Sequence, residues 1–201
     1  MTRFVLIRHA SVDGLGVQLN GRSPCVHLNQ QGRAEAAQLA ARLARIRCDA
    51  FYASPMERAQ ETADAIAASC GIPYVTEPGL NEIDYGEWTS KTFSELDRSP
   101  EWHRYNSSRH TAAIPGGESM PALRQRIAEA AERIRARHHG LVMLVTHADC
   151  IRALAAHYAG ASLDVFQRFQ VLPASVSVLS VLEHSVELVR WNDTGPLELT
   201  F

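Results

Sequence analysis

Lysine is nearly absent from this sequence, since Lys91 is the single lysine among 20 basic residues and all the others are arginine. Lys91 lies in Ser90-Lys91-Thr92 with no glycine before it, so the phosphate-binding loop of P-loop nucleotide hydrolases is missing. Lysine-centred chemistry is therefore disfavoured. Arginine has a planar guanidinium that suits two-point binding of an oxyanion, which makes an anionic ligand a reasonable first hypothesis, although most of these arginines are expected on solvated helix faces.

The sequence also lacks a paired C-x-x-C motif and any long apolar run. Its four cysteines are irregularly spaced, and no apolar stretch approaches the roughly 18 residues of a membrane span. Met1-Thr2-Arg3 leads directly into the strand-like Phe4–Ile7, without the pattern of a signal peptide. We therefore expect a cytoplasmic protein with reduced thiols. Cys150 is expected to be a small core residue, not a nucleophile.

No strong excess of charge of either sign is present, because 20 basic residues face 22 acidic ones for a net charge of −2. That balance argues against a general nucleic-acid binder and against an electrostatic membrane anchor. With 201 residues and 46% hydrophobic composition, we expect a single domain over 1–201. A domain of this size buries about 70% of the surface of its unfolded chain.

Segments with strand and helix patterns alternate along the chain, which predicts an α/β fold. We expect a three-layer α/β/α sandwich around a mostly parallel central sheet. Between the third strand and the next helix lies a long polar excursion at about 77–117, which is expected to form a lid or a binding loop. The expected strands lie at 4–7, 49–53, 74–76, 141–145, 175–182 and 186–191, and the expected helices at 32–47, 54–70, from 118 onward and at 149–159.

The start of the second helix has a recognisable signature. In Ser54-Pro55-Met56-Glu57, serine suits the N-cap, proline the first turn, and glutamate three residues after serine suits a capping box. Cys70-Gly71 suits the exit of the same helix. Arg58 is therefore expected in the first turn of a helix that follows a strand.

Polar residues follow three of the predicted strands. Arg8-His9 ends the first strand, Arg58 begins the helix after the second, and His147 follows the strand at 141–145. In open α/β sheets ligands bind beyond the carboxyl ends of the strands, so these side chains should share one edge. Two histidines and two arginines suit a phosphoryl group, which arginines stabilise and a histidine can attack.

Two further hypotheses give a role to a carboxylate, one as a proton donor and one as a metal ligand. Glu82, in Leu80-Asn81-Glu82-Ile83 at the start of the excursion, is the candidate acid that protonates the leaving oxygen. A metal site formed by His9, His147 and Asp149 is conceivable from residue types. It is disfavoured because a metal would compete with the arginines for the same space.

Six blocks of the sequence stand out as ordered motifs that span most of residues 4–155. The blocks are Leu6-Ile7-Arg8-His9-Ala10, Leu28 to Gly32, Ser54 to Ala63, Leu80-Asn81-Glu82 through Gly86-Glu87-Trp88, Pro115-Gly116-Gly117-Glu118-Ser119, and Val145-Thr146-His147. Together they resemble the signatures of the histidine phosphatase (phosphoglycerate mutase-like) superfamily. Six blocks in order at compatible spacing are far more specific than one Arg-His pair.

The resemblance implies a role for each matching residue. His9 would be the phosphorylated nucleophile, and Glu82 would be the proton donor and later the base for water. Phosphoryl oxygens would be held by Arg8, Arg58 and His147. Further phosphate contacts would come from Asn20, Gly21 and the amide of Ala148. The resemblance also implies that no metal is used, and we expect no cofactor. Ala148 and Ala10 stand where the family usually has glycine, which matters if the backbone needs a positive φ.

The function implied is a metal-independent phosphomonoesterase that acts through phosphohistidine on a small phosphorylated metabolite. One alternative is a cofactor-dependent phosphoglycerate mutase, which uses the same residues; the modest excursion favours a hydrolase. A second alternative, of another class, is a non-catalytic phosphate-binding module on the same fold. The substrate stays open among a sugar phosphate, a nucleotide-like phosphate such as α-ribazole phosphate, and a phosphorylated protein. The oligomeric state is equally open, with a homodimer as one option.

Overall fold

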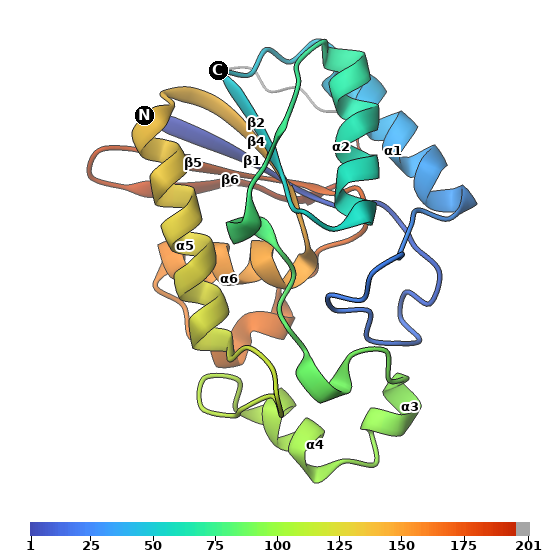
Figure 1. Ribbon diagram of the computed structural model, residues 1–201. Helices are drawn as coiled ribbons and strands as arrows, with labels where there is room; N and C mark the ends of the chain where they lie inside the picture. The colour runs from blue at the N-terminus through green and yellow to red at the C-terminus, as the bar shows by residue number, and fades with distance from the viewer. Residues whose placement is uncertain (196–201) are drawn as a thin grey trace.

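A six-stranded sheet forms the centre of the protein, with strand order β3-β2-β4-β1-β5-β6. The computed structural model describes residues 1–195 (Figure 1). The four strands on one side of the sheet run parallel, and β5 and β6 are antiparallel additions at the other edge. The mostly parallel α/β sheet predicted from the sequence is therefore confirmed. The strands are β1 (Thr2–Arg8), β2 (Ala50–Ala53), β3 (Val75–Thr76), β4 (Gly140–Thr146), β5 (Val176–Val181) and β6 (Val186–Asp193).

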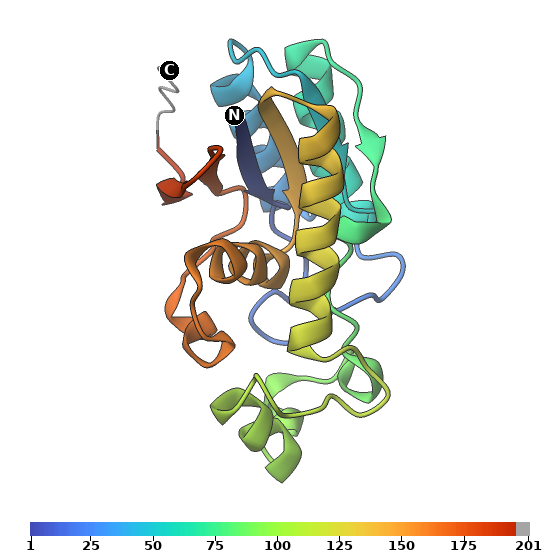
Figure 2. The same cartoon turned by 90° about the vertical axis from the view of Figure 1, so that its left-hand side faces the viewer.

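Helices cover both faces of the sheet, which gives the three predicted layers (Figures 1 and 2). Residues 4–7 of β1 are fully buried, and alternate residues point to opposite faces of the sheet. Val5 and Ile7 belong to the core beneath α1 (Gln30–Leu43) and α2 (Glu57–Cys70). Phe4 and Leu6 belong to the core beneath α5 (Met120–Arg137) and α6 (Ala148–Ala159). Of these helices, α1 ends at Leu43, earlier than the predicted residue 47, because a turn closes there between the Ile46 amide and the Leu43 carbonyl.

The excursion at 77–117 contains only short helices and is held together by aromatic packing. Trp88, Trp102 and Tyr105 are all buried, and the Trp88 ring centroid lies 5.3 Å from each of the other two. These side chains extend the core that contains Phe4 and Leu6 into the excursion, whose backbone reaches beyond the sheet in Figure 1. The helices are η1 (Pro78–Leu80), η2 (Gly86–Trp88), α3 (Phe93–Leu96) and α4 (Pro100–Ser107), and η3 (Leu163–Arg168) follows α6.

The predicted capping box at the start of α2 is wrong. The helix begins at Glu57 with Met56 at the N-cap and no side-chain cap. The Ser54 hydroxyl is instead 2.7 Å from His147 Nε2, and the Glu57 carboxylate accepts a hydrogen bond from the Cys25 amide at 3.0 Å. Both capping groups are thus used in tertiary contacts. Arg58 still lies in the first turn. As predicted, α2 ends at Cys70-Gly71, where Gly71 is the C-cap with a left-handed φ of 69°.

Two further properties of the described residues concern helix length and backbone conformation. None of the helices there is long and apolar enough to cross a membrane. Ala10 and Ala148, at the usual glycine positions, are not among the residues with a positive φ. Alanine therefore costs no backbone strain at these two positions.

Gly32 offers a test of how tightly α1 packs on the segment that follows His9. A Cβ at Gly32 would lie 1.9 Å from the Ser11 carbonyl oxygen, so Gly32→Ala must move the backbone. Overpacking of this kind costs about 1–3 kcal/mol, and we expect thermal melting to show a Tm lower by several degrees. Gln30→Ala, an exposed change in the same helix, is the control. A Gly32→Ala protein as stable as that control would contradict the close approach.

Candidate active site

The register of the sheet places the predicted residues side by side. Arg8 of β1 pairs with Thr146 of β4, so the next residues, His9 and His147, leave the same edge together. Their rings lie 5.2 Å apart between centroids. Because β2 is the other neighbour of β4, the helix that follows it brings Arg58 to the same edge. The parallel sheet thus assembles these groups from segments far apart in sequence.

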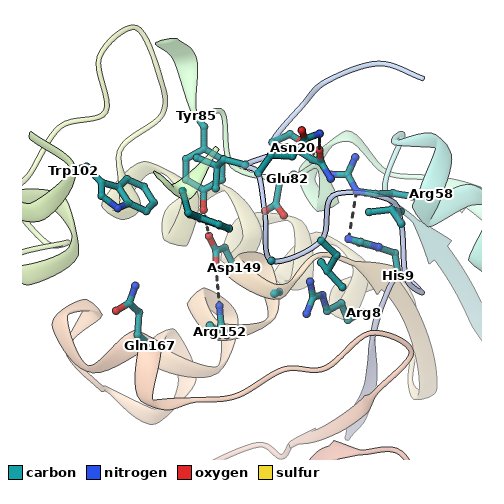
Figure 3. A pocket seen from close by; sticks show the side chains of 18 of the residues that line it. Arg8, His9, Asn20, Arg58, Glu82, Tyr85, Trp102, Asp149, Arg152 and Gln167 are labelled. Carbon is teal, nitrogen blue, oxygen red and sulfur yellow. Dashed lines mark hydrogen bonds and ion pairs between the residues drawn. The ribbon is translucent and has the colours of Figure 1, made fainter. Parts of the chain in front are cut away.

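The guanidinium of Arg58 connects the two histidines. Its Nε lies 3.3 Å from His9 Nε2 (Figure 3). Its Nη2 lies 3.3 Å from His147 Nδ1. Nη2 also donates to the Gly21 carbonyl at 2.7 Å. All three side chains are buried, with Arg58 only 2% exposed. The geometry therefore fixes both rings relative to one cation.

His9 presents an unprotonated nitrogen to the site. Its Nδ1 lies 2.8 Å from the Ala10 carbonyl oxygen, which can only accept a hydrogen bond, so Nδ1 carries the proton. Nε2 then holds the lone pair that faces Arg58. Burial first, and then the charges of Arg58 and Arg8, hold the pKa of His9 well below its usual value. The neutral imidazole is therefore ready to act as a nucleophile at ordinary pH.

Two arginines have hydrogen-bond donors that the described part of the protein does not satisfy. Arg8 Nε and Arg58 Nη1 are buried without a partner there. Arg8 is held in place by Nη1, which donates to the Val171 carbonyl at 2.7 Å. Because unpaired buried donors are costly, the pair fits an oxyanion that would satisfy both.

Glu82 is the carboxyl group of the site, and its side chain is only 12% exposed. Its Oε1 accepts from the Ile83 amide at 2.9 Å, and its Oε2 lies 3.7 Å from His147 Nδ1. Burial, followed by the charge of Asp149, raises the pKa of Glu82 to about 7. A carboxyl with that pKa can both give and take a proton near neutral pH.

The segment around Glu82 is held in place by Arg126. Arg126 of α5 donates to the carbonyls of Gly79 and Asn81, both at 2.9 Å. The same guanidinium binds Glu118 through two hydrogen bonds of 2.8 Å. Glu118 belongs to the Pro115–Ser119 block of the sequence, so this motif anchors the loop that carries Glu82.

Sequence reasoning missed other groups at the site. Asp149, considered only as a metal ligand, accepts from the Tyr85 hydroxyl and, at 3.0 Å, from Arg152 Nη1. Ser54 was predicted as a helix cap and instead contacts His147. Asp149 lies in the first turn of α6, two residues after His147. That closeness in sequence was the one feature that could have placed Asp149 at the site. Its partners could not be read from the sequence.

Three further residues were expected to contact the phosphate, and the structure gives them different roles. Asn20, Gly21 and Ala148 all line the cavity beside His9. The Asn20 side-chain oxygen accepts from Gln18 Nε2 at 2.8 Å, and the Gly21 carbonyl is occupied by Arg58. Gly21 thus orients a cation, and Ala148 is the first residue of α6, where backbone amides face outward.

A cavity of about 290 Å³ opens in front of His9, Arg8 and Arg58. Its far side is formed by the excursion, including Tyr85 and Trp102 (Figure 3). Within residues 1–195 no group of three His, Cys, Asp or Glu side chains is arranged to hold a metal ion. The arrangement can bind an oxyanion, present a nucleophilic nitrogen to it and exchange a proton with it.

Comparison with curated proteins finds several phosphatases. Phosphoserine phosphatase 1 of Hydrogenobacter thermophilus is 29% identical over 96% of this chain and 93% of its own length. Metal-independent phosphoserine phosphatase of Arabidopsis thaliana is 32% identical over 98% of this chain and 84% of its own. Adenosylcobalamin/alpha-ribazole phosphatase of Escherichia coli is 27% identical over 84% of this chain and 85% of its own.

Solved structures and a family model agree with these similarities. The structure of Bacillus stearothermophilus YhfR superposes with a TM-score of 0.91 at 27% identity, covering 98% of this chain and 100% of that one. The alpha-ribazole phosphatase of Shigella flexneri shares the fold, with a TM-score of 0.88 at 23% identity over 98% of this chain and 100% of its own. The model of the histidine phosphatase superfamily (branch 1) matches residues 4–194. This chain therefore belongs to branch 1 of the histidine phosphatase superfamily.

Proposed function

We propose that this protein is a metal-independent phosphomonoesterase that hydrolyses a small phosphorylated metabolite through a phosphohistidine at His9. The observation that carries the proposal is the unprotonated Nε2 of His9, which faces a cavity where Arg8 and Arg58 have unsatisfied donors. Relatives named as phosphatases of small metabolites support the same reaction class. We also propose that the enzyme is cytoplasmic.

In the first step, His9 Nε2 attacks phosphorus and the bond from phosphorus to the leaving oxygen breaks. Arg8 and Arg58 hold the phosphoryl oxygens and stabilise the charge that spreads over them. His147, expected from the sequence as a third phosphate contact, orients the Arg58 guanidinium through its Nδ1. Glu82, protonated because its pKa is raised to about 7, gives its proton to the leaving oxygen. The products of this step are the free alcohol, a phosphohistidine and the Glu82 carboxylate.

In the second step, water replaces the alcohol in front of the phosphohistidine. The Glu82 carboxylate takes a proton from that water as its oxygen attacks phosphorus. The bond between phosphorus and His9 Nε2 breaks and inorganic phosphate leaves. Glu82 is then protonated again, and Asp149 helps by raising its pKa.

The first test concerns metal ions. Because guanidinium groups supply the positive charge that metal ions bring to other phosphatases, release of inorganic phosphate from p-nitrophenyl phosphate should persist in EDTA. Vanadate, which mimics trigonal-bipyramidal phosphorus, should inhibit. Activity that EDTA abolishes and a divalent metal restores would overturn the metal-independent part of the proposal.

The second test concerns Glu82→Gln. General acid catalysis contributes about 10²–10⁴-fold, so formation of the phosphoenzyme from an alkyl phosphate should slow by a factor in that range. p-Nitrophenolate leaves without a proton, so the burst with p-nitrophenyl phosphate should change much less. Rapid-quench measurement of the burst separates this step from the later water attack, in which the same carboxylate acts.

The pH profile gives an independent signature of Glu82. The acid form is lost as pH rises through about 7, so kcat/KM for the alkyl phosphate should fall on the alkaline side. Glu82→Gln should remove that limb, while Glu87→Gln, an exposed change in the same segment, should leave it. Equal slowing of both substrates by Glu82→Gln would instead assign Glu82 to phosphate positioning.

A further inference from the structure

Arg109 is a buried cation outside the catalytic group. It follows α4 in the excursion, is only 5% exposed, and lines the cavity that contains His9. Its Nη1 donates to the Tyr105 hydroxyl at 3.0 Å and its Nη2 to Asn106 Oδ1 at 2.7 Å. The guanidinium lies 4.4 Å from the centre of the Tyr105 ring and 5.2 Å from that of Phe166. All of these partners are neutral. Arg109 Nε is buried and has no hydrogen-bond partner within residues 1–195.

Arg109 lies near the end of the cavity that is remote from the nucleophile. Gln167 donates to the same Asn106 oxygen, at 2.9 Å, and so marks the position of the guanidinium. Figure 3 shows Gln167 and Trp102 on the opposite side of the pocket from His9 and Arg58. A ligand phosphorylated at the His9 end would extend its remaining atoms toward Arg109.

The charges of the cavity leave Arg109 without a counterion. Arg152 is paired with Asp149 at 3.0 Å, and Arg8 and Arg58 face the phosphate, which carries a charge of about −2 near neutral pH. Glu82 enters the reaction as the neutral acid. Across residues 1–195 no carboxylate oxygen forms a salt bridge with Arg109 within 4.0 Å. A buried charge without a partner is costly, so an anionic ligand group would offset that cost.

We propose that Arg109 binds a second anionic group on the leaving part of the substrate. The preferred substrates are then small phosphomonoesters that also carry a carboxylate or a second phosphate. The cavity of about 290 Å³ suits a short carbon skeleton between the two anions. This inference rests on the proposed phosphomonoesterase function and adds a substrate class to it.

Three substrates with one carbon skeleton test the proposal. Glycerol 3-phosphate has no second anion, 3-phosphoglycerate has a carboxylate, and glycerol 1,3-bisphosphate has a second phosphate. A hydrogen-bonded charge pair is worth roughly one to two factors of ten in binding. The wild-type kcat/KM for one of the two substrates with a second anion should therefore exceed that for glycerol 3-phosphate by about 10- to 100-fold. The better of the two identifies the second anion.

Arg109→Gln should bring the ratio of kcat/KM values, with and without the second anion, close to one. The loss should appear mainly in KM because Arg109 touches a part of the substrate that does not react. Arg109→Lys keeps the charge without the planar fork and should give an intermediate ratio; it carries the test if the glutamine variant melts well below wild type. Arg104→Gln, an exposed change on α4, should keep the wild-type ratio.

The proposal is overturned if the wild-type protein does not prefer 3-phosphoglycerate or glycerol 1,3-bisphosphate over glycerol 3-phosphate. It is also overturned if Arg109→Gln leaves the preference intact or slows all three substrates equally, since the latter is the effect of lost packing alone. Failure of the proposed function looks different: wild-type protein would then release no phosphate from these substrates or from p-nitrophenyl phosphate.

Discussion

The contact between the buried Arg58 guanidinium and the two histidines is the interaction around which the site is organised. A cation that is 2% exposed must be surrounded by acceptors, and here these are His9, His147 and the Gly21 carbonyl. Each acceptor comes from a different chain segment. The parallel sheet brings the segments together, and Arg58 then fixes the distance between the imidazoles and keeps a donor, Nη1, for a ligand.

Arg126 holds the segment that carries the acid Glu82, as Arg58 holds the nucleophile His9. Arg126 binds the Glu118 carboxylate and the carbonyls of the segment before Glu82. That segment lies in the excursion, which lacks long helices and depends on such bonds and on its aromatic cluster for its shape. The near absence of lysine from the sequence is consistent with this use of arginine, because a planar fork can satisfy several acceptors at once.

The sequence predicted those parts of the site that follow from strand ends. His9, Arg58 and His147 come directly after strands or at a helix start, and parallel strands must align those positions at one edge. The prediction that Glu82 is the acid depended on the family resemblance, because an isolated glutamate in a polar stretch looks like any solvated carboxylate. The alternation of strand and helix patterns also predicted the three-layer fold, which the structure confirms.

Tertiary contacts between distant segments could not be predicted in this way. Ser54 has a good local role as a helix cap, yet its hydroxyl contacts His147, 93 residues away. Likewise Tyr85 and Asp149 meet across 64 residues. Arg109 looks like one more surface arginine until the packing of Tyr105 and Phe166 against it is known. Local propensity carries no information about such partners.

The central claim is that phosphate passes through a covalent bond to His9, and trapping that intermediate tests it most directly. The protein would be mixed rapidly with p-nitrophenyl phosphate, denatured in alkali because phosphohistidine is acid-labile, and mapped by mass spectrometry of its peptides. We expect one phosphate on the peptide that contains His9, formed within the burst, and none in His9→Ala, which should also lose nearly all turnover. Phosphate on a different residue, or turnover close to wild type in His9→Ala, would contradict the account.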